Sequence, residues 1–101
     1  MNSPAFTPYY AVIFTSKLSN SEGYAEMAVE MEKLAKQQDG FIGIDSARED
    51  VGITVSYWRD VESIKAWKEN FAHLQAQKLG KEKWYESYSV RIAKVEREYG
   101  N

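Results

Sequence analysis

The stretch Tyr9–Thr15 (YYAVIFT) decides the fold, because it reads as a strand that is apolar on both sides. Six of its residues are β-branched or aromatic, and it contains no Gly or Pro, a composition typical of a strand. Successive side chains of a strand point to opposite faces. One face therefore receives Tyr9, Ala11 and Ile13, and the other receives Tyr10, Val12 and Phe14. A single layer of helices can cover only one of these two faces.

A helix is expected after this strand, over about residues 22–38. Apolar side chains recur there at the 3.6-residue period of one buried helix face. Acidic residues precede basic ones along it, which suits the helix dipole. The candidate N-caps are Ser19, Asn20 and Ser21. The pair Asp39-Gly40 is expected to end the helix.

A hairpin and a second helix are expected next. The hairpin takes residues 41–47 and 53–58 as strands and residues 49–52 as the turn. Asp60 is the expected N-cap of the second helix, and Ser63 can assist in its first turn. Gly80 is the expected C-cap, and fraying or a bend is expected around residues 72–77.

A long final strand closes the pattern. A short extra turn is expected over residues 81–85 and the strand over residues 88–99, with a bulge where its alternation slips between Ile92 and Val95. The order β-α-β-β-α-β predicts an α+β, ferredoxin-like domain with a four-stranded antiparallel sheet and both helices on one face. We expect this domain over residues 9–100, with residues 1–8 as a flexible N-terminal tail.

The composition excludes several classes of protein. The chain of 101 residues has no cysteine and a single histidine, so thiolate chemistry and a His-built metal site are not expected. Its net charge of −2 and its lack of a basic patch oppose nucleic-acid and anionic-membrane partners. No apolar run approaches the ~20 residues of a membrane span, and the N-terminus lacks the features of a signal peptide. A soluble, cytoplasmic protein is expected.

The open face of the sheet predicts a partner. If the helices cover one face, a monomer would leave an apolar wall larger than the few hundred Å² that monomers expose. A second copy packed face to face through a two-fold axis buries both walls and closes a barrel. We therefore expect a homodimer. In the alternative, Tyr10 and Trp58 line a small-molecule groove in a monomer.

Residues 56–100 carry a family resemblance. Strand three ends in Ser56-Tyr57-Trp58, the next helix carries Ala66-Trp67-Lys68 and then His73, and Trp84-Tyr85 precedes the last strand. With the predicted fold, this resembles the antibiotic biosynthesis monooxygenase domains of the dimeric α+β barrel superfamily, in a small, mostly uncharacterised bacterial branch. The resemblance covers about residues 9–99. It implies a dimeric barrel and, in the family's oxygenases, catalysis without a cofactor.

The resemblance also implies a chemistry. In such oxygenases the protein deprotonates a phenolic or quinol-type substrate, and the electron-rich anion reacts with O₂. This needs a dry aromatic pocket, a base, and a donor that holds the anion. The candidate substrate-binding residues are Trp58, Asn70, Phe71 and Tyr85, and the candidate catalytic residues are Trp67 and His73. For Trp67 core filling, and for Tyr85 anchoring of the last strand, are the alternatives.

His73 is the first candidate for a general base, because only its side chain has an ordinary pKa near neutrality. On a regular helix it shares a face with Asn70 but not with Trp67, unless the helix bends after Phe71. The alternative is a half-exposed histidine with a structural hydrogen bond.

Two other functions stay open. A non-catalytic dimer that binds a small molecule or takes part in a stress response fits the same features. A haem-degrading monooxygenase fits less well: Trp67 matches such relatives, but the first strand offers Thr15 or Ser16 where they have Asn, and Gln77 stands where they have the iron-ligating His. We therefore expect no metal and no cofactor.

Overall fold

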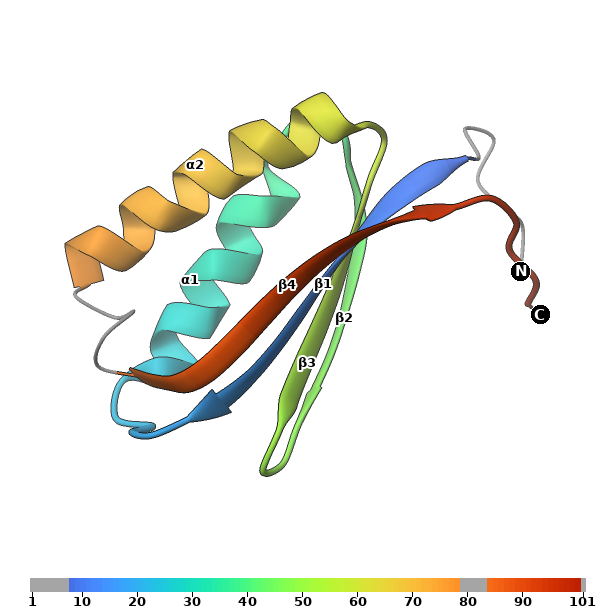
Figure 1. Ribbon diagram of the computed structural model, residues 1–101. Helices are drawn as coiled ribbons and strands as arrows, with labels where there is room; N and C mark the ends of the chain where they lie inside the picture. Colours follow the sequence, from blue (N-terminus) through green and yellow to red (C-terminus); the bar gives the residue numbers. More distant parts are fainter. Residues whose placement is uncertain (1–7, 79–83, 101) are drawn as a thin grey trace.

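The computed structural model describes residues 8–78 and 84–100, and two helices and one four-stranded sheet lie in this part of the chain. The elements are β1 (Tyr9–Leu18), α1 (Tyr24–Lys36), β2 (Phe41–Arg48), β3 (Gly52–Trp58), α2 (Val61–Lys78) and β4 (Tyr85–Val95). All neighbouring strands are antiparallel, in the order β2-β3-β1-β4. Both helices lie on one face of the sheet (Figure 1). The ferredoxin-like plan is confirmed.

The start of α1 differs from the prediction. The helix begins at Tyr24, and the residue before it, Gly23, has a φ of 78° and no side-chain cap bond. Glycine adopts this left-handed conformation without the steric cost of a Cβ atom. The predicted cap by a serine or asparagine is therefore wrong. Asn20 instead accepts the N–H of Glu22 through its side-chain oxygen at 2.9 Å, in the turn before the helix.

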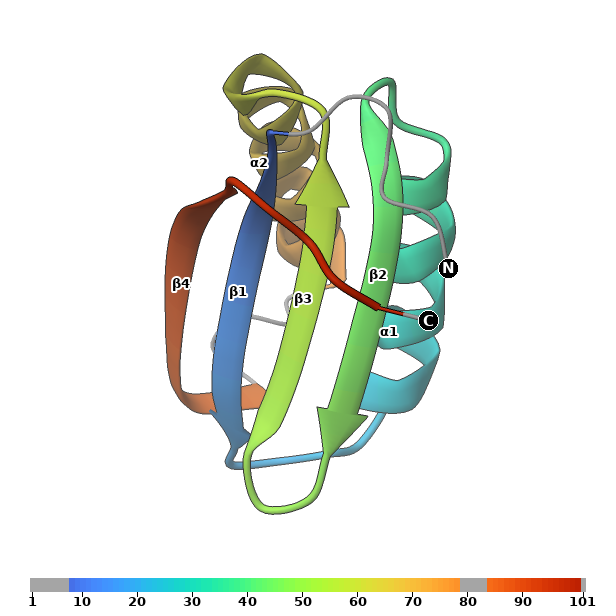
Figure 2. The same cartoon turned by 90° about the vertical axis from the view of Figure 1, so that its right-hand side faces the viewer.

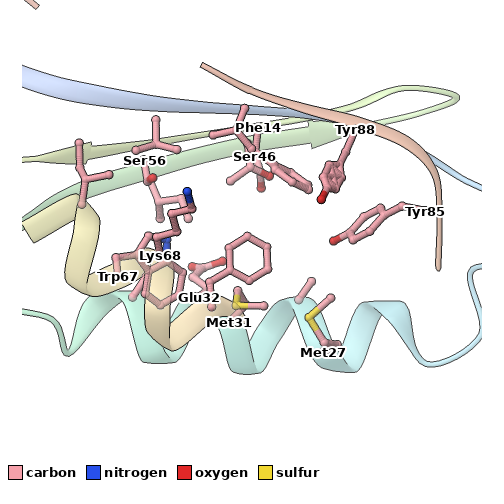
Figure 3. A pocket seen from close by; sticks show the side chains of 18 of the residues that line it. Phe14, Met27, Met31, Glu32, Ser46, Ser56, Trp67, Lys68, Tyr85 and Tyr88 are labelled. Atoms are coloured by element: carbon pink, nitrogen blue, oxygen red, sulfur yellow. The ribbon is translucent and has the colours of Figure 1, made fainter. Parts of the chain in front are cut away.

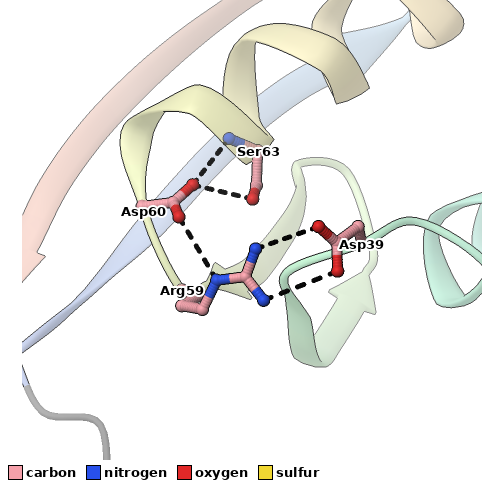
Figure 4. Close-up of polar contacts among 4 residues, drawn as sticks. All are labelled: Asp39, Arg59, Asp60 and Ser63. Carbon is pink, nitrogen blue, oxygen red and sulfur yellow. Dashed lines mark hydrogen bonds and ion pairs between the residues drawn. The ribbon is translucent and has the colours of Figure 1, made fainter.

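The start of α2 confirms the predicted cap (Figure 4). Asp60 accepts hydrogen bonds from the N–H of Ser63 at 2.8 Å and from its hydroxyl at 2.7 Å, and these bonds lower the pKa of the Asp60 carboxyl. Arg59 pairs with Asp60 at 3.2 Å and with Asp39 at 3.0 Å. Its backbone N–H donates to the carbonyl of Gly40 at 2.7 Å. This Arg59 corner ties the turn after α1 to the beginning of α2.

The helix α2 is continuous from Val61 to Lys78. The expected fraying within residues 72–77 is therefore wrong, and a bend there stays a prediction. The predicted C-cap at Gly80 and most of the predicted turn over residues 81–85 lie outside the described residues. Neither described helix combines the length and the hydropathy that a membrane span needs.

The irregularity of β4 lies at the opposite end from the predicted one. Pairing with β1 is regular from Val95 back to Ser87, and the shift comes between Lys17 and Leu18, where Glu86 is passed over. The predicted bulge between Ile92 and Val95 is wrong, and the strand spans Tyr85–Val95 instead of residues 88–99. Its start is set by Trp84, whose indole N–H donates to the carbonyl of Glu22 at 2.6 Å.

The core lies between the sheet and the two helices. Trp58 is fully buried there, and its ring stacks on Trp67 with a centroid distance of 5.8 Å. The indole N–H of Trp58 donates to the hydroxyl of Ser56 at 2.8 Å, which satisfies its one buried donor. Ala35 of α1 and Ile64 of α2 complete the buried cluster. Three of its four members therefore come from β3 and α2.

The other face of the sheet is partly covered by the chain itself. Residues 96–100, which follow β4, lie on this side of the sheet near the beginning of β1, and they lead away from β2 and β3 (Figures 1 and 2). Tyr9 is buried beneath them and donates its hydroxyl to Glu98 at 2.9 Å. Burial and this carboxylate raise the pKa of Tyr9 to about 12. Farther along the same face Ile53 stays 46% exposed, so the cover is incomplete.

Candidate functional site

A cavity of about 490 Å³ lies between the sheet and the helices, on the covered face (Figure 3). All six elements contribute side chains to it. Its walls are mainly apolar and include Val12, Phe14, Met27, Met31, Ile44, Ile64, Trp67, Phe71, Val90 and Ile92. A space of this size and character is typical of a small-molecule site.

One end of the cavity is aromatic. The ring of Phe14 on β1 lies 5.5 Å from Tyr85, 5.6 Å from Tyr88 and 5.8 Å from Phe71. Tyr85 and Tyr88 are themselves 5.6 Å apart, in an edge-to-face arrangement. The hydroxyls of both tyrosines point into the cavity (Figure 3). The start of β4 thus places two hydrogen-bond donors at the end of an otherwise apolar space.

Tyr24 closes the same end from α1. Its ring lies 5.8 Å from that of Tyr85, and the guanidinium carbon of Arg48 lies 5.1 Å from its centroid. A cation over the ring face stabilises this packing. Arg48 also donates a hydrogen bond to the hydroxyl of Ser16. The aromatic end is therefore held by contacts from β1, β2 and α1.

The other end has a flat wall. Trp67 stacks between Trp58 and Phe71, with an interplanar angle of 23° to the first ring and 25° to the second. Trp67 lines the cavity although only 7% of its surface is exposed. Such a rigid indole face can stack against a planar ligand and exclude water.

Among the described residues that line the cavity, two are charged. Glu32 on α1 is ion-paired to Lys36 one turn later, at 3.1 Å. Lys68 on α2 also lines the cavity. The other polar groups are neutral: Ser46, Thr54 and Ser56 contribute hydroxyls from the sheet. Among the side chains that the structure describes, no group of three or more acidic or histidine residues could hold a metal ion.

The structure separates the residues that the sequence singled out. Trp67, Phe71 and Tyr85 line the cavity together. Trp58 lies behind Trp67 with no exposed surface, and its contact with a ligand stays a prediction. Asn70 donates to the side-chain oxygen of Gln38 at 2.9 Å and to the carbonyl of Ala66, which joins α2 to the end of α1.

His73 lies on an exposed part of α2 and is not among the side chains that line the cavity. Because the helix continues regularly past Phe71, His73 is not turned toward Trp67. Its role as a general base stays a prediction.

Sequence reasoning missed Lys68 as a cavity residue. The signal was present, because Lys68 follows Ile64 by four positions and precedes Phe71 by three, on the apolar stripe of α2. A charged residue on such a stripe either reaches past it to water or faces a site. Tyr24, Met27 and Met31 were also missed as lining residues, because their spacing on α1 is equally typical of a core.

The fold and the cavity place the protein in a class of small ferredoxin-like domains that have an apolar cavity between the sheet and the helices. The family model described as monooxygenase af470-like matches residues 11–101, and the chain belongs to this family. The uncharacterized protein YqjZ of Bacillus subtilis (strain 168) is 50% identical to it over 94 residues, which cover 90% of this chain and 82% of that protein.

Solved structures share the fold at low sequence identity. SnoaB, a cofactor-independent oxygenase from Streptomyces nogalater, superposes with a TM-score of 0.76 at 8% identity, over 94% of this chain and all of that chain. PA3566 from Pseudomonas aeruginosa superposes with a TM-score of 0.69 at 15% identity, over 95% of this chain and all of that chain. At these identities the likeness establishes the fold alone.

Proposed function

We propose that this protein is a cofactor-independent monooxygenase that oxidises a small phenolic or quinol-type aromatic compound in the cavity. The observation that carries the proposal is an apolar, aromatic cavity into which the hydroxyls of Tyr85 and Tyr88 both point. Membership of a monooxygenase-like family and the shared fold with SnoaB support it.

The proposed reaction uses the reducing power of the substrate. A quinol anion donates electrons to O₂, one oxygen atom bonds to a ring carbon that loses its hydrogen, and the other leaves as water. The quinol becomes a hydroxyquinone, so atoms and electrons balance without a further reductant. The apolar walls receive the ring, Trp67 stacks on it, and the two tyrosine hydroxyls hold the phenolate oxygen.

The tyrosine hydroxyls provide the test. We expect the protein, after exhaustive dialysis, to consume O₂ with members of a quinol panel. Tyr85→Phe and Tyr88→Phe should each lower kcat by about 10²-fold, because each removes one donor to the anion. Tyr99→Phe is the matched control, since Tyr99 is 84% exposed and far outside the cavity lining, and its rate should stay unchanged.

Three results would count against this proposal in different ways. Absence of O₂ uptake across the panel, with saturable binding of the same quinols, would favour the non-catalytic binding module. A Soret band on titration with haem would favour the haem enzyme. A large loss of rate in His73→Ala, with none in the tyrosine variants, would indicate that His73 and not the tyrosines acts in the reaction.

We also propose that the protein acts as a homodimer through the open face of the sheet. Ile53 is 46% exposed there, and Ile13 and Val55 are half-buried. A second copy would bury this strip. Sedimentation equilibrium at micromolar concentration should report twice the 11.6 kDa mass of the chain, and Ile53→Lys should shift the species toward the monomer. A wild-type protein that sediments at 11.6 kDa would exclude the dimer.

A further inference from the structure

Lys68 places a positive charge at the exposed rim of the largely apolar cavity. It lines the apolar cavity from α2, one residue after Trp67. Among the residues that the structure describes, it makes no ion pair, whereas Lys17, Lys36 and Arg59 each do. Lys68 is exposed, so water solvates its ammonium at the rim of the cavity, where an entering ligand can reach it.

The nearest candidate counter-charge within the cavity is already engaged. Glu32 is the acidic residue in the described lining, and Lys36 holds it at 3.1 Å. The described lining thus presents a carboxylate in an exposed ion pair and an exposed ammonium without an ion pair. A ligand that binds against the apolar walls displaces water from one side of this ammonium, which lowers the effective dielectric constant there and strengthens its attraction for an anionic group of the ligand.

The cavity is polar at two separate ends. Figure 3 shows Lys68 and Glu32 beside Trp67 at one end and Tyr85 and Tyr88 at the other, with Phe14 between them. A planar ligand that stacks on Trp67 therefore meets an ammonium at one end and phenolic hydroxyls at the other. The two ends demand different groups: an anion beside Lys68, and an oxygen that accepts hydrogen bonds beside the tyrosines.

We infer that Lys68 selects aromatic acids, and that the substrate is a hydroxylated aromatic compound with a carboxylate or a similarly acidic group at the end remote from the reacting oxygen. This inference rests on the proposed function, since it names the substrate class of the same cavity. Lys68 acts as a specificity-determining residue, and the oxidation itself is left to the groups at the tyrosine end.

Binding of unreactive probes tests the inference without turnover. The probes are 2-naphthoate and its neutral isostere 2-naphthamide, and quenching of tryptophan fluorescence, to which Trp67 contributes, reports the Kd. We expect wild-type protein to bind the naphthoate about 10-fold more tightly, the value for a charge-assisted hydrogen bond. The preference should shrink at 0.5 M salt, because salt screens a partly exposed pair.

Variants on α2 separate charge from packing. Lys68→Met keeps the length and the apolar stem, and it should bind the two probes equally. Lys68→Arg should keep the preference. The control is Lys65→Met, because Lys65 is an exposed lysine of the same helix outside the cavity lining, and this variant should behave as the wild type.

The outcomes distinguish the two proposals. Equal binding of both probes by the wild type, or a preference that survives in Lys68→Met, overturns the role of Lys68 and leaves the oxygenase proposal standing. Failure of both probes to bind overturns the cavity as a site for aromatic compounds, and with it both proposals. A preference lost only in Lys68→Met supports the inference whether or not O₂ is consumed.

Discussion

Replacing Trp58 with alanine is expected to lower the free energy of unfolding by about 3–5 kcal/mol, the range for removal of a buried indole. The side chain has no exposed surface. It stacks on Trp67 at 5.8 Å and meets the edge of Phe41 at 5.5 Å. Its loss leaves a cavity between sheet and helices and removes the donor from Ser56. For a domain of this size we expect the melting temperature to fall by roughly 20 °C.

Thermal and urea unfolding, followed by far-ultraviolet circular dichroism, measure this effect. Trp58→Phe is the matched control, because it keeps an aromatic ring in the same place and loses only part of the volume and the N–H. Its cost should be about 1–2 kcal/mol. If alanine at this position costs less than phenylalanine, or if both changes are nearly neutral, Trp58 is not the centre of the core.

Gly40→Ala should also destabilise the protein strongly, by about 2–4 kcal/mol, for two separate reasons. The φ of Gly40 is 88°, a region that costs an L-residue about 1–2 kcal/mol. An added Cβ would also lie 2.7 Å from the Cβ of Ser63, too close for two carbon atoms. Ser63 cannot easily move away, because its hydroxyl and N–H both donate to Asp60. The remaining cost is that of overpacking.

Gly43→Ala gives this prediction its control. Gly43 is the third residue of β2, the strand that begins directly after Gly40, and a Cβ there would meet the ring of Tyr57 at 3.8 Å, an ordinary contact. Its effect on the free energy of unfolding should stay within about 1 kcal/mol. Equal melting temperatures for the two variants would mean that the Arg59 corner tolerates a side chain at Gly40 and that the proposed strain is absent.

The order of the strands and helices could be predicted, because hydrophobic periodicity and the residues of turns and caps are local properties of the sequence. Tyr9–Thr15 alternates as a strand, and Asp60 with Ser63 forms a cap within one turn, so neither depends on distant residues. The predicted boundaries are wrong where a contact between distant residues sets the start of a helix or strand. Gly23 precedes α1 in a left-handed conformation, and Trp84, 62 residues away from its partner Glu22, sets the start of β4. No local pattern reports such a contact.

In the candidate site, too, local neighbours could be predicted and long-range neighbours could not. Trp67 and Phe71 could be predicted as neighbours, because they are four positions apart on one helix. That they share a cavity with Tyr85 and Tyr88 depends on the pairing of β4 beside β1. The exposed position of His73 follows from the continuity of α2, which the polar stretch after Phe71 did not indicate.

The sequence by itself determined the order of the strands and helices, the buried stripe of α2 and the apolar character of both sides of β1, because each is written in the spacing of neighbouring residues. The tertiary structure was needed to show which face encloses the cavity, that Glu98 after β4 bonds to Tyr9, and that Lys68 lies at the rim of the cavity without an ion pair among the described residues. Those features depend on how the sheet is assembled from strands far apart in the chain.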